Sequence, residues 1–136
     1  MDEQKATDRI LKAVRNPYTT ILGHLTSRLL LQRKGYPIDH KKVIDECAEY
    51  GVIIELNANP RRLDMDWRWI GYALEKGVKI SINPDAHTIE GLNHVKLGIN
   101  VARKGCLTKE MTLNTLSIKE IEEYFKERKH NLMLDS

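Results

Sequence analysis

The stretches "GVIIELNAN" at residues 51–59 and "GVKISINPD" at residues 77–85 share one pattern, offset by 26 residues. Both have the pattern Gly-Val-x-Ile-x-apolar-Asn, and each follows a helical segment that ends in "EYG" or "EKG". Short β-branched runs that alternate with helical segments are typical of helix–strand units with parallel strands. The repeat therefore predicts the α/β class.

The rest of the chain continues this alternation as a single domain, because no linker or low-complexity segment interrupts residues 1–136. Asp39 is a suitable N-cap and Gly51 a suitable stop for one helix, and Ser117 with Glu120 forms a capping box for another. We expect helices at 3–15, 40–50, 66–76, 95–104 and 118–129, strands at 18–24, 52–57 and 78–83, a loop with a helical turn at 25–37, and a frayed tail at 129–136.

Composition indicates an ordinary soluble domain. The 136 residues are 41% hydrophobic and 30% charged, with a net charge of +3, which permits a polyanionic partner without indicating one. Long apolar runs and a secretory pattern are missing, so we expect a cytoplasmic protein with no membrane partner. Cys47 and Cys106 lie far apart without a CxxC motif, and we expect reduced thiols rather than a disulfide.

Polar residues follow each expected strand. They are His24, Asn57 and the stretch Asn83–His87, and in a parallel sheet these strand ends meet at one edge. By strand parity, Glu55 and Ser81 share the face opposite the apolar side chains, where we expect neighbouring backbone to satisfy them by hydrogen bonds. About three strands are too few for a closed barrel, so the chain is either a small open domain or part of a barrel.

Asp85 and His87 form an Asp-x-His pair directly after a strand. Carboxylate oxygens and imidazole nitrogens are ligands for zinc, manganese or iron, but "NPD" is also an ordinary turn, and the pair alone favours the turn. His24, at the equivalent end of another strand, moves the balance toward a metal site. The remaining histidines are expected at the surface: His40, His94 and His130.

Five arginines follow the expected strand ends. Arg61, Arg62 and Arg68 follow Asn57, and Arg28 and Arg33 follow His24. Arginine at such positions can hold phosphate, and an equally good interpretation is a solvated loop charge. Neither a Gly-rich phosphate loop nor a nucleophile elbow is present in the sequence.

Four segments together resemble a known family: "ILGHLTSRLLLQRKGY", "IELNANPRRLDMDWRW", "ISINPDAHTIEGL" and "GINVARKGCLTKEMTLNTL". In order and spacing they resemble the C-terminal portion of the PHP (polymerase and histidinol phosphatase) domain of bacterial family-X DNA polymerases. The resemblance covers about residues 8–125. Leu25 and Ser27 depart from the family pattern beside His24, which affects the shape of that loop.

The resemblance implies about three to four strands of a distorted, TIM-like (β/α)7 barrel. It implies that His24, Asp85 and His87 are metal ligands, each for a different one of as many as three divalent ions (Mn, Zn or Fe). It also implies a phosphoesterase of the 3′-5′ exonuclease type, a DNA-repair hydrolase that acts on phosphodiester bonds at DNA 3′ ends. Asn57, Arg61, Arg62 and Arg28 are the candidate substrate contacts.

The family's other ligands lie in the first half of the domain, which this sequence lacks. We therefore expect a fragment that is inactive alone, whose partners are the missing N-terminal half and, in the longer protein, DNA. Open sheet edges predict self-association of the fragment. Two alternatives remain, a small-molecule phosphatase of the histidinol-phosphate type and a non-catalytic interaction domain with relic ligands.

Overall fold

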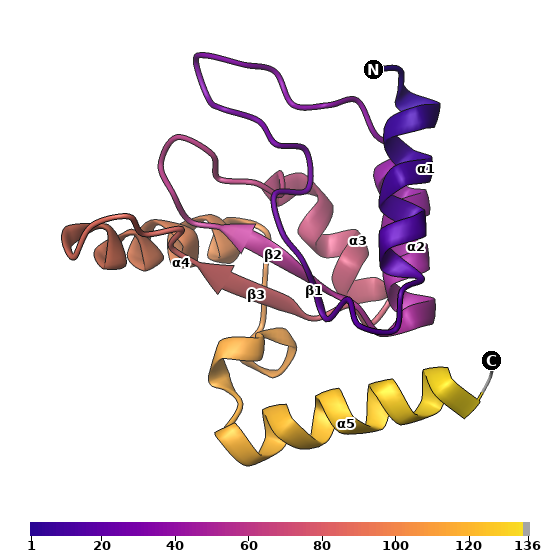
Figure 1. Ribbon diagram of the computed structural model, residues 1–136. Helices are drawn as coiled ribbons and strands as arrows, with labels where there is room; N and C mark the ends of the chain where they lie inside the picture. Colours follow the sequence, from indigo (N-terminus) through magenta and orange to yellow (C-terminus); the bar gives the residue numbers. More distant parts are fainter. Residues whose placement is uncertain (135–136) are drawn as a thin grey trace.

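A parallel sheet with the strand order β1–β2–β3 forms the centre of the computed structural model, which describes residues 1–134 (Figure 1). The strands are β1 (Ile21–Leu22), β2 (Ile53–Asn57) and β3 (Ile80–Asn83). The helices are α1 (Glu3–Val14), α2 (His40–Tyr50), α3 (Ile70–Glu75), α4 (Val95–Lys104) and α5 (Ile118–Leu134), with 3-10 turns η1 (Trp67–Trp69), η2 (Glu90–His94), η3 (Lys109–Met111) and η4 (Leu113–Thr115). The expected α/β class is confirmed.

The sequence repeat corresponds to the register of the sheet. Ile54 pairs with Ile80, and the pairing continues in step to Asn57 and Asn83. This is the same 26-residue offset that relates the two stretches in sequence. The two asparagines that close the repeats therefore lie side by side at the carboxyl ends of β2 and β3.

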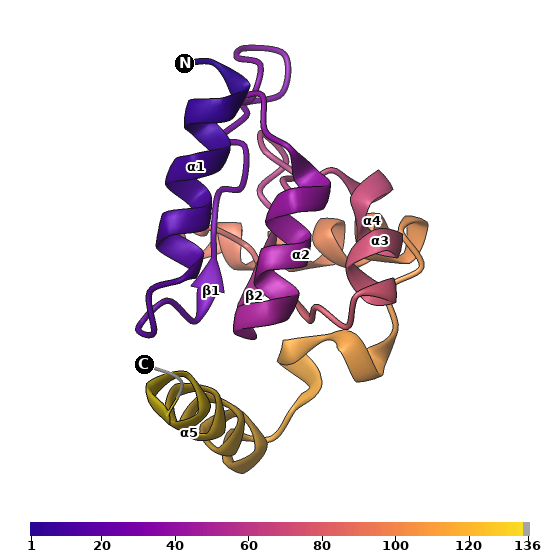
Figure 2. The same ribbon diagram turned by 90° about the vertical axis from the view of Figure 1, so that its right-hand side faces the viewer.

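Helices α1, α2 and α3 stand on one side of the sheet, as two views show (Figures 1 and 2). Ile54, Leu56 and Ile80 point into this core and are fully buried, as are Val43 and Ile44 of α2. Full burial of such a side chain stabilises the fold by roughly 1.5–3 kcal/mol. The alternating isoleucines of the repeat thus supply the face on which the helices pack.

Helix α4 packs closely against the end of the sheet. Its Gly98 lies so near that a Cβ atom there would come within 2.6 Å of side-chain carbons of Ala58 and Ile82. Only glycine therefore allows this approach without displacing the strand ends. The close contact fixes the backbone just after β2 and at the end of β3, where the candidate site residues begin.

The capping predictions are confirmed. Asp39 accepts a hydrogen bond from the Lys42 backbone N–H at 3.0 Å, and Gly51 ends α2 with φ of 66°. In the capping box, Ser117 N–H donates to the Glu120 carboxylate at 2.6 Å, and Glu120 N–H donates to the Ser117 hydroxyl at 3.2 Å. Local side-chain chemistry therefore defines these helix ends.

Two expected elements are shorter or divided. The strand predicted at 18–24 is limited to Ile21–Leu22, because a turn precedes it and the chain leaves the extended conformation at His24, whose φ is 50°. The helix predicted at 66–76 is divided into η1 and α3, with the Asp66 side chain capping the 3-10 turn through the Arg68 N–H. The loop expected at 25–37 is observed, and it contains one turn at 29–33, in which the N–H groups of Gln32 and Arg33 donate to the Leu29 carbonyl beside an antiparallel Leu29–Arg33 bridge.

Helix α5 is longer than predicted, because it continues past residue 129 to Leu134. The expected frayed tail is thus helical over 129–134, and residues 135–136 lie outside the described residues. Arg128 anchors this part by donating to the carbonyls of Tyr50 at 2.9 Å and Pro17 at 3.0 Å. Tyr124 adds a hydrogen bond to the Gly51 carbonyl at 2.9 Å.

The two edges of the sheet differ. At the β3 edge, the Asn114 side chain accepts from the Ile82 N–H at 2.8 Å and donates to its carbonyl at 2.9 Å, while Thr112 bridges to Ile80. At the other edge, β1 pairs with β2 alone among the strands of residues 1–134.

In the same residues, no helix is long and apolar enough to cross a membrane.

Candidate functional site

Three candidate residues meet at the carboxyl edge of the sheet. The Asn57 amide nitrogen lies 3.4 Å from His24 Nδ1 and 3.3 Å from Asp85 Oδ2. Asn57 is fully buried at the end of the central strand, whereas His24 and Asp85 follow the two strands that flank it. Parallel strands bring these positions together, and the buried amide holds both side chains.

His24 and Asp85 also share an uncommon backbone conformation. Their φ angles are 50° and 51°, in the left-handed region that residues other than glycine seldom adopt. Such strain persists only where the surroundings impose it, and it concentrates at functional sites. Here it turns each chain sharply at the end of a strand and directs the side chain toward Asn57.

The Glu55 side chain of β2 connects the ends of the two flanking strands. Its carboxylate accepts the His24 backbone N–H at 3.0 Å and the Asn83 amide at 3.0 Å, and the Ser81 hydroxyl donates to Asn83 at 2.8 Å. Glu55 thus has the backbone partner that was expected, whereas Ser81 bonds to the Asn83 side chain. A Cβ atom at Gly23 would lie 3.2 Å from Glu55 Oε2, so glycine leaves room for the carboxylate.

His87 lies at the exposed outer side of the site. Its Nδ1 is 2.9 Å from the carbonyl oxygen of Asp85, which orients the ring and leaves Nε2 free to bind a ligand. Within residues 1–134, however, no group of three or more His, Cys, Asp and Glu side chains is placed to hold one metal ion. A catalytic ion usually takes about three protein ligands, so the donors described here do not complete a site.

The three candidate arginines have different roles. Arg62 Nε lies 3.4 Å from Asp85 Oδ2, in an ion pair in which both side chains are largely buried. The Arg28 side chain has a structural role, because it donates hydrogen bonds to the backbone carbonyls of Arg62 and Leu63. Arg61 is exposed. Of these three side chains, Arg61 is thus the most accessible to a phosphate, and Arg62 is already bound to the site.

The other histidines depart from the expected surface placement in two cases. His40 is half-buried and stacks on Trp69 with ring centroids 4.9 Å apart, and this burial lowers the pKa of His40. His94 is half-buried beside α4, and His130 is exposed as expected. None of the three belongs to the cluster around Asn57 that hydrogen bonds define. The sequence pattern missed the stacking because Trp69 comes from a different helical segment.

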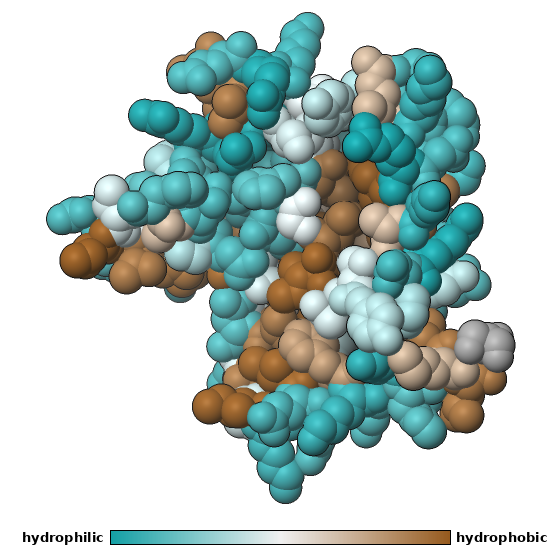
Figure 3. Space-filling model, in the orientation of Figure 1, coloured by the Kyte–Doolittle hydropathy of each residue, from teal (hydrophilic) through white to brown (hydrophobic). Residues whose placement is uncertain are grey.

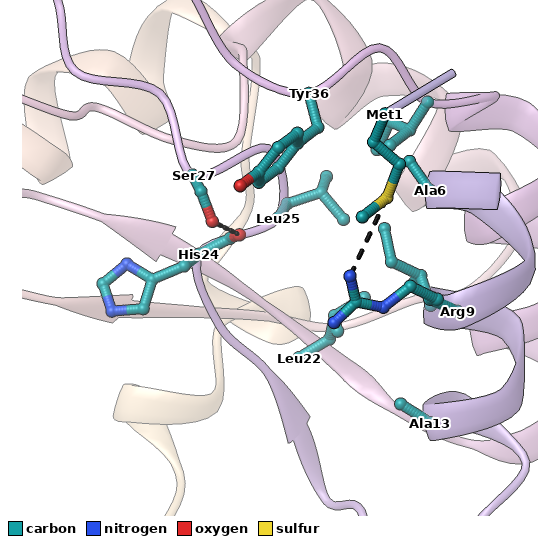
Figure 4. Close-up of a pocket in the computed structure, with 11 residues that line it drawn as sticks. Met1, Ala6, Arg9, Ala13, Leu22, His24, Leu25, Ser27 and Tyr36 are labelled. Atoms are coloured by element: carbon teal, nitrogen blue, oxygen red, sulfur yellow. Dashed lines mark hydrogen bonds between the residues drawn. The ribbon is translucent and has the colours of Figure 1, made fainter. Parts of the chain in front are cut away.

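A cavity of about 290 Å³ lies between α1, the end of β1 and the loop that follows β1. It is lined by apolar and basic side chains of α1 and the following loop, among them Arg9, Leu22, Leu25 and Tyr36 (Figure 4). The His24 imidazole points away from these side chains (Figure 4). His24 and Ser27 also line the cavity, so His24 lies between the cavity and the polar cluster at the sheet edge.

Apolar surface extends along the same side of the molecule. In the space-filling view, hydrophobic residues form a band down the middle of this face, over β1 and toward α5 (Figure 3). Ile21 and Leu22 of β1 are partly exposed, and Ile118 of α5 is 79% exposed. The face beside the unpaired strand edge is thus less polar than the surface around it.

The parallel sheet and the polar cluster at its carboxyl edge are features of α/β enzymes that bind ligands at strand ends. No protein-family model matches the chain. The chain is 40% identical over 118 residues to the DNA polymerase/3′-5′ exonuclease PolX of Bacillus subtilis (strain 168), a match that covers 87% of this chain. The expected resemblance to the C-terminal part of the PHP domain of a family-X polymerase is confirmed.

Phosphatases are also among the relatives. A probable phosphatase of Thermoanaerobacter sp. (strain X514) is 31% identical over 96% of this chain, and one of Caldanaerobacter subterraneus subsp. tengcongensis is 28% identical over 96%. The chain spans 21% of the length of the Bacillus protein and 53% and 51% of the two phosphatases. These names support a phosphoesterase-type fragment.

Proposed function

We propose that this chain forms the C-terminal part of a PHP-type (β/α)7 barrel in a metal-dependent phosphoesterase. The longer protein hydrolyses phosphodiester bonds at DNA 3′ ends, and DNA is its partner. The meeting of His24 and Asp85 at Asn57 supports this proposal most strongly, because it places two metal-binding side chains at the sheet edge where such barrels act. The name of the Bacillus relative supports the choice of substrate.

In this proposal His24, Asp85 and His87 bind divalent ions such as Mn, Zn or Fe. When bound, such ions lower the pKa of water and stabilise developing negative charge on phosphate oxygens. Asn57 orients His24 and Asp85, and Arg61 provides an exposed cation for a substrate phosphate. Arg28 acts indirectly, because its hydrogen bonds hold the backbone that carries Arg62.

The additional donors would come from the N-terminal half of the domain in the longer protein. The unpaired edge of β1 and the apolar band beside it are suited to receive further strands, because an open edge presents unpaired backbone groups. Without that half, the three ligands are too few to hold ions in a poised arrangement. The chain alone is then catalytically silent.

A small-molecule phosphatase is the second candidate. The probable phosphatases match 96% of this chain, a larger share than the polymerase does. The two candidates share the metal site and differ in the phosphoester that is hydrolysed. A phosphatase removes a terminal phosphate, whereas an exonuclease cleaves a phosphodiester.

A chimera tests the proposal. This chain is joined to the half of the Thermoanaerobacter phosphatase that it does not match, and hydrolysis is measured with manganese on a DNA 3′ end and on a phosphomonoester. We expect turnover that His24→Ala and Asp85→Asn each lower at least about a hundredfold, as loss of a metal ligand should. Preference for the monoester would support the second candidate. A folded chimera without either activity would indicate an interaction domain instead.

A further inference from the structure

Positive charge is concentrated in two loops beside the candidate site. Residues 25–38 and 58–63, the basic loops, contain five arginine and lysine side chains and no aspartate or glutamate. The whole chain has 22 basic and 19 acidic residues, so 17 basic and 19 acidic residues lie outside the basic loops, a net charge of −2 there. The carboxylates just beyond the basic loops are engaged, since Asp39 caps α2 and Asp64 is fully buried. The surface of the basic loops is therefore suited to a polyanion.

The two basic loops are joined to each other at the same edge of the sheet. The Leu30 N–H donates to the Arg61 carbonyl at 2.6 Å, and Arg28 Nε donates to the Arg62 carbonyl at 2.9 Å. Both loops lie beyond the carboxyl ends of β1 and β2, where the candidate site also lies (Figure 1). A ligand that covers the basic loops therefore lies next to this site.

The turn at 29–33 presents an apolar tip beside two cations. Leu31 is fully exposed and has a φ of 65°, and Arg33 and Lys34 are also exposed. A hollow of about 420 Å³ lies beside this tip and is lined by the same three residues, among others. In complexes with DNA, cations of this kind bind phosphates, and exposed apolar side chains contact bases.

Three cations of the basic loops have no acidic partner. Within residues 1–134, the side chains of Arg33, Lys34 and Arg61 form no ion pair, whereas the two other arginines of the basic loops pair with aspartates. All three side chains are exposed. Their charges are thus available to phosphate groups.

We propose that a DNA strand lies across the basic loops, with its phosphates at Arg33, Lys34 and Arg61 and one base against Leu31. The proposal rests on the function proposed above, since it takes DNA as the substrate. It adds the surface that binds the strand next to the hydrolysed bond. Because a small phosphomonoester has no strand to place there, this surface favours the polymer over a small substrate.

Removal of two charges from this surface tests the phosphate contacts. Binding of a fluorescein-labelled oligothymidylate of about 12 nucleotides to the purified chain is measured by fluorescence anisotropy, with EDTA present so that no metal ion takes part. We expect Arg33→Gln combined with Lys34→Gln to weaken binding about tenfold at low salt. The slope of log affinity against log salt concentration should become shallower by about 1.4, since each phosphate contact on a single strand contributes about 0.7.

A control pair separates this surface from general attraction by charge. Lys126→Gln combined with Lys129→Gln removes the same charge from exposed positions of α5, at the opposite end of the molecule from the basic loops (Figures 1 and 2). This variant should change the affinity less than about twofold, because distant exposed charges are screened. Equal losses from the two double variants overturn the proposal, as does no detectable binding by the unchanged chain.

The base contact and the need for a strand have their own tests. Leu31→Ser should weaken binding about threefold with an unchanged salt slope, because an apolar contact releases no counterions. Thymidine monophosphate at the same phosphate concentration should not displace the oligonucleotide. An unchanged affinity of Leu31→Ser overturns the base contact, and displacement by the mononucleotide overturns the proposal in favour of a site for single phosphates.

A second measurement uses the unchanged chain and so does not depend on how a variant folds. The ¹⁵N resonances of Arg33 Nε and Arg61 Nε are followed during titration with the same oligonucleotide. We expect both to shift, while that of Arg15, at the end of α1 away from the basic loops, does not (Figure 1). Unmoved resonances overturn the proposal. Because neither measurement involves hydrolysis, a negative result here leaves the activity of the chimera unaffected, and an inactive chimera leaves this binding unaffected.

Discussion

At the scale of single residues, Asn57 determines whether the candidate site exists. It is fully buried, and its amide nitrogen is placed against both His24 and Asp85. The side-chain oxygen Oδ1 of Asn57 accepts a hydrogen bond from the Asn59 N–H at 3.0 Å and so also shapes the loop that follows β2. One buried side chain therefore joins the ends of three strands.

Replacement of Asn57 by leucine should destabilise the fold by about 1–3 kcal/mol, because the exchange removes the hydrogen bonds that the buried Asn57 amide makes to Asp85 and to the Asn59 N–H. Chemical denaturation followed by circular dichroism measures the change in the free energy of unfolding. Asn93→Leu, at an exposed position of η2, is the matched control and should stay within about 0.5 kcal/mol. Equal stability of the two variants would show that the Asn57 contacts contribute nothing.

At the scale of elements, Asp66 stabilises the start of the helical segment that leads into α3. Its carboxylate accepts hydrogen bonds from the Arg68 side chain, at 2.7 Å from Nη2, and from the Arg68 N–H at 3.0 Å. The hydrogen bonds from Arg68 lower the pKa of Asp66 to about 2 against the opposing effect of burial. The folded state therefore favours the ionised form of the Asp66 carboxyl group.

Asp66→Asn should lower stability by about 0.5–1 kcal/mol at neutral pH, since Arg68 is exposed and the pair is screened. A carboxyl group whose pKa is lowered on folding stabilises the fold above its unfolded pKa, near 4, and this contribution is lost as pH falls toward 2. Urea denaturation at pH 7, 4 and 2.5 should therefore show that the two proteins differ in their free energy of unfolding at pH 7 and 4, and that this difference becomes small at pH 2.5. A difference of constant size would contradict this linkage.

Helix α5 depends on one buried arginine. Arg128 is 7% exposed and donates to the carbonyls of Tyr50 and Pro17, and burial lowers its pKa. We expect Arg128→Met to cost about 2 kcal/mol, because both carbonyls lose a charged donor. Hydrogen exchange should become faster along α5 than in α2. The control is Lys126→Met on the exposed side of the same helix. Equal rates of hydrogen exchange along α5 in both variants would show that Arg128 does not anchor this helix.

Sequence reasoning succeeded where a single element carries the signal. The repeat indicated parallel helix–strand units and has the same 26-residue offset as the register of β2 and β3, and Asp39 with Gly51 predicted both ends of α2, because period and caps are local. It also placed His24, Asn57 and Asp85 at one sheet edge, because parallel topology relates the strand ends. It failed for contacts between segments that neither the repeat nor the strand order relates. The Arg62–Asp85 pair, the stacking of His40 on Trp69 and the extension of α5 through Arg128 all join parts of the chain whose spacing carries no pattern.

At the scale of the whole molecule, the two sheet edges predict how the chain associates. The β3 edge is covered by Asn114, whereas β1 has no further strand beside it among residues 1–134 and lies next to the apolar band. Open edges with apolar neighbours pair with other chains. The chain alone should therefore self-associate, and analytical ultracentrifugation at increasing concentration should show species heavier than 15.7 kDa. A monomer throughout the range would contradict this expectation.

The central claim is that this chain carries only part of a phosphoesterase site. His24 and Asp85 meet at Asn57, and His87 lies outside them, but no three metal-binding side chains of residues 1–134 converge on one ion. The most direct test measures hydrolysis of a DNA 3′ end by the purified chain with manganese or zinc, beside His87→Ala. The account predicts no turnover above background for either protein. Robust turnover that His87→Ala abolishes would contradict it, because the chain would then hold a complete site.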